Sequence, residues 1–443
     1  MPDALLEKLR ASVGSPNVLT GIELSPYVVE GRTPEAAVFP GSVEEVAAVI
    51  GLAAEAARPV TPWGGGTAAS VGMPAARAGL VLGLRRLGRM LEHEPGDLTA
   101  TVEAGMTVDA FQTALHSRGQ WVSLDPADAD RATVGGVLAT NASGPRRHLY
   151  GTARDLLIGV TVVTADGAVV RGGGKVVKNV AGYDLPKLFV GSHGTLGVIV
   201  SVTVKLRPLP DDERLVAVVF DRSKDAGAAA RAVMGSDLIP NALELVDAEA
   251  SRALGLDSAV GPGGCALIVG FDGVGEQVEW QCGELGRITA PLGGRAVRPL
   301  PEEAWTRLAS AARDAFDPPA AVMRLIVLPA AVTEAIEHGA SAARQRGLRS
   351  AWSCHAGVGV ITAALASSGA LPEPGPIASV LHDWRALARA AGGHATLDWA
   401  PLAVKSAVPV WDDAGASGRI MQRLKASLDP HNVLNPGRFV AGI

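Results

Sequence analysis

Residues 62–70, Pro62-Trp63-Gly64-Gly65-Gly66-Thr67-Ala68-Ala69-Ser70, place three successive glycines directly after a short run that predicts a strand. Without a Cβ the backbone can turn sharply there, and its N–H groups can converge on an anion such as a pyrophosphate. The stretch is neither a G-x-G-x-x-G turn nor a phosphate-binding loop ending in Gly-Lys-Ser/Thr. Taken alone, it fits either an anion-binding loop or a tight surface turn.

Two further segments are equally rich in small residues. Residues 133–144 read TVGGVLATNASG, and residues 191–199 read GSHGTLGVI. Such composition indicates backbone that lies close against something large and flat, either a ligand or a neighbouring element. Because the three segments fall within about 140 residues and lie between predicted helices and strands, we expect one large ligand to share them.

The surrounding sequence predicts alternating helices and strands. Ser42, followed by Glu45, is the start of a capping box ahead of a helix, and Thr107 caps a second helix that follows a strand at 99–103. From about residue 215, strand-like runs alternate with alanine-rich helical segments, which indicates a second domain. We therefore predict an α+β protein of two domains.

Composition excludes several classes of function. The 443 residues are 48% hydrophobic and 19% charged, with a net charge of −5, so we expect a sizeable core and no nucleic-acid partner. The three cysteines, Cys265, Cys282 and Cys354, lie far apart without CxxC spacing. They predict neither a disulfide framework nor an iron–sulfur cluster held by this chain itself.

The sequence also bears on location. The first ten residues, MPDALLEKLR, lack the basic and apolar regions of a signal peptide. The longest uncharged run, 356–372, is rich in Gly and Ser and too short to span a bilayer comfortably. We expect a cytoplasmic protein that reaches the inner face of the membrane only through a complex.

The order of the motifs carries a resemblance. P-x-G-G-G-T, then T-x-G-G-x-x-A-x-N-A-S-G with Tyr150-Gly151, then G-S-x-G-T-L-G-V-I resembles the vanillyl-alcohol oxidase-type (PCMH-type) FAD-binding family. Residues 178–185, KNVAGYDL, and 391–396, AGGHAT, are similar to the FAD-binding subunit of bacterial glycolate oxidase, as is the ending at 428–438. The resemblance covers about 35–210 and 350–440.

This resemblance implies a fold and a domain order. After an N-terminal segment (1–34) we expect a two-subdomain PCMH-type FAD-binding domain (35–210). A smaller α+β cap domain with an antiparallel sheet (211–412) follows. A C-terminal segment (413–443) then packs on the FAD domain.

The resemblance also implies which residues bind FAD. We expect the glycine loop to hold the pyrophosphate, the second segment to follow the adenosine and isoalloxazine, and the third to support the adenine half. The expected residues are Trp63, Gly64, Gly65, Gly66, Thr67, Ala68, Ser70, Asp125, Pro126, Thr133, Gly135, Gly136, Ala139, Asn141, Ser143, Gly144, Gly197, Val198, Ile199 and Asn435. Thr67 stands where members with covalent flavin often have a histidine, so we expect non-covalent FAD.

Related 2-hydroxy-acid dehydrogenases carry H-x-G-D-G-N-x-H, which binds a metal, and E-H-G-I-G, which supplies a third ligand and the base. In this chain the first frame keeps His355 but has Thr362 at the second histidine. The second frame has Asp398 for the glutamate and Trp399 for the base. We therefore expect no metal, and interpret His355 as a strand residue whose ring is satisfied by a neighbour.

Two other residues are candidates for catalysis. His394, in the motif that resembles the glycolate oxidase subunit, is either a base near the flavin or a turn residue, and both interpretations stay open. Arg324 is a possible partner for a substrate carboxylate, although a salt-bridged strand residue is the commoner fate. The resemblance implies a FAD-binding subunit of a heteromeric glycolate or 2-hydroxy-acid dehydrogenase.

Such a complex implies two partner chains. A second FAD-binding catalytic subunit would oxidise the small 2-hydroxy acid, and an iron–sulfur subunit would pass the electrons to a quinone. Two alternatives remain: a self-sufficient FAD-dependent 2-hydroxy-acid oxidoreductase without a metal, and a non-catalytic assembly subunit whose FAD is structural.

Overall fold

The computed structural model describes residues 3–75, 77–174, 183–295, 297–367 and 373–443. By their contacts these residues form two compact units. The first unit contains residues 1–142, 152–209 and 413–443, and the second contains 143–151 and 210–412. Residues 178–182 of the KNVAGYDL motif lie outside the described residues.

The first unit begins with a small sheet of order β1-β2-β4-β3, in which β2, β4 and β3 run parallel. Its strands are β1 (Val18–Leu19), β2 (Ala36–Val38), β4 (Leu80–Gly83) and β3 (Val60–Trp63). Helices α1 (Asp3–Val13) and α2 (Val43–Glu55) pack against each other in this unit. Ser42 caps α2 as predicted, by accepting the N–H of Glu45, but the Glu45 carboxylate accepts the N–H of Gly41 at 2.6 Å rather than that of Ser42.

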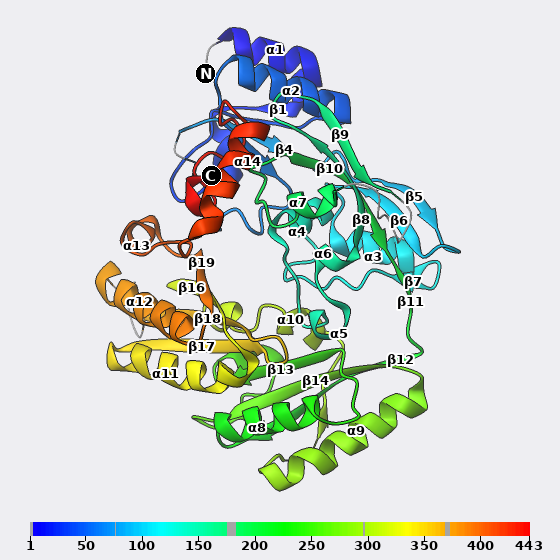
Figure 1. Ribbon diagram of the computed structural model, residues 1–443, viewed down its shortest axis with the longest axis vertical. Coiled ribbons are helices and arrows are strands. Elements are labelled where there is room, and N and C mark those ends of the chain that lie inside the picture. Colours follow the sequence, from blue (N-terminus) through cyan, green and yellow to red (C-terminus); the bar gives the residue numbers. More distant parts are fainter. Residues whose placement is uncertain (1–2, 76, 175–182, 296, 368–372) are drawn as a thin grey trace. The chain divides into compact units, whose positions relative to one another are not determined.

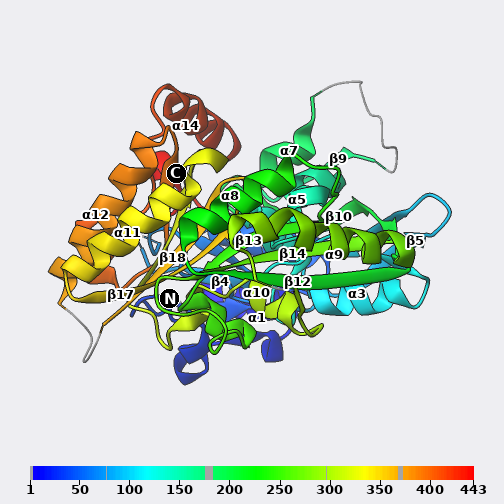
Figure 2. The same ribbon diagram turned by 90° about the horizontal axis from the view of Figure 1, so that it is seen from below.

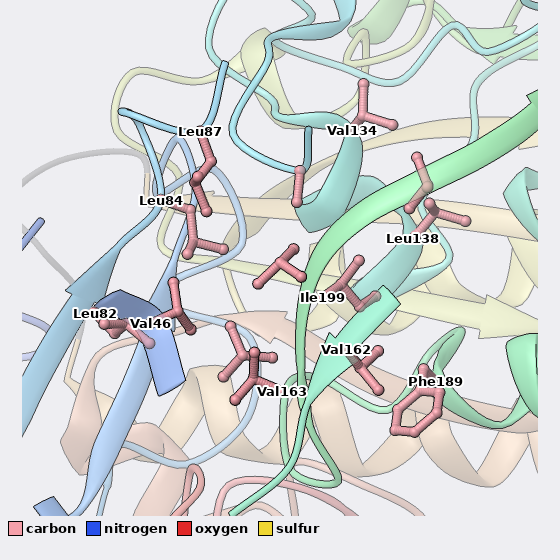
Figure 3. Packing of buried hydrophobic residues seen from close by; sticks show 14 of the residues in the cluster. Val46, Leu82, Leu84, Leu87, Val134, Leu138, Val162, Val163, Phe189 and Ile199 are labelled. Atoms are coloured by element: carbon pink, nitrogen blue, oxygen red, sulfur yellow. The ribbon is translucent and has the colours of Figure 1, made fainter. Parts of the chain in front are cut away.

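A second sheet of the first unit is antiparallel throughout, with order β5-β6-β10-β8-β9. Its strands are β5 (Met90–Glu94), β6 (Thr99–Glu103), β10 (Val198–Lys205), β8 (Leu157–Val163) and β9 (Val169–Gly173). The helix α3 (Val108–His116) begins at Thr107, as its cap predicts. Both sheets and their helices share one core, whose members in Figure 3 include Val46, Leu82, Leu84, Leu87, Val134, Leu138, Val162, Val163, Phe189 and Ile199.

The C-terminal segment belongs to the first unit (Figure 1). Helix α14 (Ala416–Leu428) carries Lys425, whose buried ammonium donates to Asp429 at 2.6 Å and to the carbonyls of Thr195 and Leu434. The buried Asp429 carboxylate also accepts the N–H groups of Val433 and Leu434. This ion pair, with its hydrogen bonds, shapes the turn after α14 so that the chain returns beside β3.

The second unit is built on one antiparallel sheet of order β15-β12-β14-β13-β17-β18-β16-β19. The strands are β15 (Arg298–Pro299), β12 (Asp212–Phe220), β14 (Cys265–Gly273), β13 (Ala242–Asp247), β17 (Leu348–His355), β18 (Val360–Ser367), β16 (Ala321–Ile326) and β19 (His394–Trp399). Four helices, α8 (Ser223–Met234), α9 (Gly275–Thr289), α11 (Val332–Gln345) and α12 (Pro374–Ala390), form one layer in which α8 contacts α9 and α11, and α11 contacts α12 (Figure 2).

The two faces of this sheet differ because side chains alternate along each strand. Trp352 on β17 projects toward the helices, where its ring lies edge-on to Trp384 of α12 at 4.7 Å and covers Gly339 of α11. Ser353 and His355 alternate with Trp352 and therefore project from the opposite face. That opposite face carries the polar residues described below.

The α+β fold class is confirmed, and three details differ from expectation. Residues 143–151, expected in the FAD-binding domain, belong by their contacts to the second unit. The small-residue segment at 133–144 contains a short helix, α4 (Val134–Thr140). The residues just before the expected domain boundary at 210 are not a plain connection, because they include a strand, β11 (Arg207–Pro208), which pairs with β7 (Gln120–Trp121). Within the part of the chain that the structure describes, no helix is long and apolar enough to cross a membrane.

We predict that Asp429→Asn lowers the free energy of unfolding by about 3–5 kcal/mol, because the substitution leaves the Lys425 ammonium buried without a counter-charge. The midpoint of urea unfolding measures the change. Asp97→Asn, at an exposed turn, is the control and should leave the midpoint unchanged. Equal midpoints for the two variants would contradict the assigned role of the buried pair.

Candidate functional site

The glycine loop after β3 is shaped by the chain that packs against it. A Cβ on Gly64 would lie 2.2 Å from the hydroxyl oxygen of Thr133, and a Cβ on Gly65 would lie 1.7 Å from the carbonyl oxygen of Arg131. Gly66 has a φ of +77°, and a Cβ there would meet the Trp63 ring at 2.8 Å. The triplet is therefore required by close packing as well as by the turn, so its glycines alone do not prove a ligand.

The N–H groups of this loop are the stronger sign of a ligand. No described residue accepts a hydrogen bond from the backbone N–H groups of residues 64–68. The far end of the loop is held by Arg438, whose guanidinium donates to the carbonyls of Ala68 and Ala69. A fixed loop with several unpaired N–H groups is the arrangement that binds phosphate oxygens.

The second predicted segment begins beside this loop. Thr133 caps α4 by accepting the N–H of Gly136, and a Cβ on Gly135 would lie 2.6 Å from the Ala104 Cβ. Asn141 ends α4 in the left-handed conformation, with a φ of 51°. Small residues are needed here because the helix packs closely against its neighbours. Gly64 and Gly65 contact Thr133 and Arg131, at and just before the N-terminus of α4.

The buried side-chain polar atoms of the first unit without a hydrogen-bond partner among the described residues include one atom each of Asn435 and Ser123. Asn435 donates from Nδ2 to the His193 carbonyl at 2.8 Å, but its Oδ1 accepts nothing, and the Ser123 hydroxyl is also unpaired. A buried polar atom without a hydrogen bond costs free energy unless a ligand or water pairs with it. Asn435 was predicted to approach the flavin, whereas Ser123 was not identified from the sequence.

The other predicted cofactor residues lie at several places in the structure, and some of them pack against neighbouring side chains. Gly197, Val198 and Ile199 lie at the start of β10 in the core, where a Cβ on Gly197 would touch Phe189 at 3.0 Å. Trp63 packs edge-on against Tyr27 at 5.4 Å. The remaining predicted positions in the first unit are Ser70, Asp125, Pro126 and Ala139, and those in the second unit are Ser143 and Gly144. Ser143 has a buried hydroxyl without a partner among the described residues.

In the second unit, residues 143–151 are held on the sheet by ionic and aromatic contacts. Arg146 forms a two-point ion pair with Glu213, at 2.9 and 2.6 Å, and lies over the Trp305 ring at 3.8 Å. Tyr150 donates to Asp272. These contacts fix the segment on the second unit.

The polar face of the second unit's sheet carries a continuous row of side chains. Ser353, Thr362, Arg324 and Thr396 are direct cross-strand neighbours on β17, β18, β16 and β19, so they project from the same face. Arg324 Nη2 donates to the Asp398 carboxylate at 2.8 Å. Arg324 is thus salt-bridged, while no described residue pairs with its Nη1 or Nε.

Two histidines near this row differ in their contacts. His355 approaches Glu244, with its Nδ1 at 2.6 Å from Oε1, so the satisfied ring predicted for this strand residue is present. His394 begins β19 with an exposed side chain whose ring bonds to no described residue. Glu244 was not predicted, although a lone acid within the apolar strand ALELV is a visible signal. Among the described residues, no three His, Cys, Asp or Glu side chains form a group able to hold a metal.

We predict that Gly65→Ala weakens FAD binding about 10- to 100-fold, since overpacking against the Arg131 carbonyl costs roughly 1–3 kcal/mol and displaces the loop. Fluorescence titration of the apoprotein with FAD measures the dissociation constant. Gly96→Ala is the matched control, because a Cβ at that exposed glycine meets nothing within 4 Å. If both variants bind FAD as tightly as the wild type, the loop is not part of the binding site.

Comparison with known proteins gives consistent results. Residues 34–173 match the family model described as "FAD binding domain", and residues 209–439 match "FAD linked oxidases, C-terminal domain". Glycolate oxidase subunit GlcD of Bacillus subtilis is 35% identical over 214 residues, which cover 48% of this chain and 46% of that protein. D-2-hydroxyglutarate dehydrogenase of Xanthomonas citri pv. viticola is 41% identical over 202 residues, or 45% and 43% of the two chains.

The chain thus spans about half the length of these curated relatives. The solved structure of p-cresol methylhydroxylase with substrate bound has a TM-score of 0.81 and 17% identity, and covers 100% of this chain and 96% of that one. At this identity the likeness shows the fold. Because the family models match both halves, the chain belongs to the FAD-linked oxidases, with FAD as its cofactor.

Proposed function

We propose that this protein is a FAD-dependent dehydrogenase of a small 2-hydroxy acid and acts as a subunit that passes the electrons to an iron–sulfur partner and a quinone. Its membership in the FAD-linked oxidases supports the redox chemistry. The names of two relatives, a glycolate oxidase subunit and a D-2-hydroxyglutarate dehydrogenase, support the substrate class. The observation that carries the proposal is Arg324, which has unused guanidinium donors beside the Glu244–His355 pair on one sheet face.

The first unit has unpaired hydrogen-bonding groups that suit the phosphates and the ring of FAD. The unpaired N–H groups of residues 64–68 would hold the pyrophosphate, and Asn435 Oδ1 would accept a hydrogen bond from the flavin. Thr67 has no ring nitrogen with which to form a covalent bond to flavin, which supports a non-covalent cofactor. When bound, FAD accepts a hydride from the substrate.

The polar face of the second unit fits a substrate carboxylate. Arg324 keeps one guanidinium nitrogen on Asp398 and can offer Nη1 and Nε to a carboxylate as a fork. Asp398 holds the guanidinium in place and reduces its excess charge, which favours a mono-anion over an inorganic dianion. Ser353 and Thr362 beside it supply hydroxyl groups for a second polar contact.

The iron–sulfur partner is proposed because the chain lacks cluster ligands of its own. Cys265 and Cys354 are buried, and burial raises the pKa of both thiols, which disfavours the thiolate that a cluster needs. The second candidate function assigns substrate oxidation to a second FAD-binding subunit. It follows from the changed metal and base positions at Thr362 and Trp399, and it predicts no reduction of the flavin in the isolated chain.

We predict that glycolate, D-lactate or D-2-hydroxyglutarate reduces the FAD of the isolated chain when they are mixed without oxygen. The loss of absorbance near 450 nm follows the reaction. In Arg324→Met the substrate dissociation constant should rise about 10- to 100-fold, because a hydrogen bond to a charged group contributes roughly 1.5–3 kcal/mol.

Arg307→Met is the matched control, since Arg307 is an exposed residue of α10 (Ala304–Leu308). If none of these acids reduces the FAD of the isolated chain, the result would favour the second candidate function, in which a second FAD-binding subunit oxidises the substrate. If the reconstituted complex were also inert, the FAD would be structural and the proposal would be wrong.

A further inference from the structure

The Glu244–His355 pair is built differently from an ordinary surface contact. His355 on β17 and Glu244 on β13 are direct cross-strand neighbours, and Nδ1 lies 2.6 Å from Oε1. The Glu244 side chain is 2% exposed, while 17% of the His355 side chain is exposed. The carboxylate is therefore buried and the imidazole retains a path to solvent or ligand.

The other ring nitrogen of His355 is available. No described residue forms a hydrogen bond with Nε2, and a carboxylate that receives Nδ1–H leaves the Nε2 lone pair as the acceptor. Burying a charged pair rarely stabilises a fold more than apolar residues of the same volume would. A dyad of this form is how a carboxylate orients a histidine that takes up a proton.

The position of His355 on the sheet suits a short ligand. Arg324 lies two strands away and two residues along, on the same face, which places the two Cα atoms about 12 Å apart in a regular sheet. Ser353 and Thr362 lie between them. Two long side chains at this separation can hold the carboxylate and the hydroxyl of a molecule of two to five carbons.

His148 completes the surroundings of the pair. Its ring packs on the turn after β17, where a Cβ on Gly357 would lie 2.2 Å from Cε1. Burial lowers the pKa of His148, and the nearby His355 lowers it further. Both effects favour the neutral form of His148, which reduces its repulsion of a proton on the neighbouring ring.

We propose that His355 Nε2 is the acceptor of the substrate hydroxyl proton, with Glu244 as the residue that positions its ring. The inference rests on the proposed function. The O–H bond of the 2-hydroxy acid breaks as its proton goes to Nε2. Bound FAD would supply the acceptor for the hydride from the adjacent carbon, so the product would be a 2-oxo acid. His355 is then a catalytic residue and Glu244 a positioning residue.

The first test compares variants in anaerobic flavin reduction. His355→Asn keeps a donor for Glu244 but has no Nε2, so the limiting rate should fall about 10²- to 10⁴-fold, with the substrate dissociation constant unchanged. Glu244→Gln should lower the limiting rate while leaving the dissociation constant unaltered, and the absorbance spectrum of bound FAD should match the wild type. His382→Asn is the control, because His382 is exposed on α12 and contacts the Ala407 carbonyl.

A second test does not depend on turnover. Oxalate, which resembles the deprotonated substrate, is titrated calorimetrically into the FAD-loaded chain in two buffers of different ionisation enthalpy, above the ordinary imidazole pKa. The wild type should take up about one proton per oxalate, and His355→Asn should take up none. Proton uptake by the variant equal to that of the wild type would overturn the proposal.

The outcomes separate the two hypotheses. If no 2-hydroxy acid reduces the wild type, either alone or in the reconstituted complex, the proposed function fails. If the wild type is reduced and His355→Asn is reduced at the same rate, the function stands and the role of His355 is wrong. Loss of reduction in His394→Ala together with a wild-type rate in His355→Asn would move the base to His394.

Discussion

The close approach of two backbones at Gly65 is the constraint on which the cofactor site depends. The Arg131 carbonyl occupies the space that any Cβ at this position would need. Because the loop cannot retreat from this contact, the N–H groups of residues 64–68 stay in one place without acceptors among the described residues. Thr133, which lies two residues after Arg131, caps the N-terminus of α4 at the same point.

The C-terminal segment adds a second restraint to the same unit. The buried Lys425–Asp429 pair fixes the turn that carries Asn435 back toward β3, and Arg438 then holds the carbonyls at the end of the glycine loop. Segments separated by more than 350 residues in sequence thus determine one loop. In the second unit the four long helices cover one face of the sheet, whereas the other face packs an apolar cluster against α10 and also carries Glu244, His355 and Arg324.

Local signals predicted much of the fold. The cap at Thr107 and the strand at 99–103 are where the sequence places them, and the order of the glycine motifs predicted the α+β class and FAD. The helix α4 was missed because its consecutive glycines disfavour helices, and only packing of Gly135 on Ala104 explains them.

The candidate site was predictable only in part. His355 pairs with Glu244 across 111 residues and Arg324 with Asp398 across 74, so neither contact follows from spacing along the chain. They require the strand order β13-β17-β18-β16-β19, which long-range pairing determines and local propensity does not. The sequence predicted a strand residue with a satisfied ring at His355, but it did not identify Glu244 as the neighbour.

The cofactor site depends above all on the N–H groups of residues 64–68, which would bind the FAD phosphates. Amide hydrogen–deuterium exchange on the apoprotein and the FAD-loaded chain tests this binding directly, with helix α9 of the second unit as an internal control. FAD should slow exchange at residues 64–68 and leave α9 unaffected, because these amides donate to no described residue without the cofactor. Unchanged exchange at 64–68 in a chain that has bound FAD would contradict it.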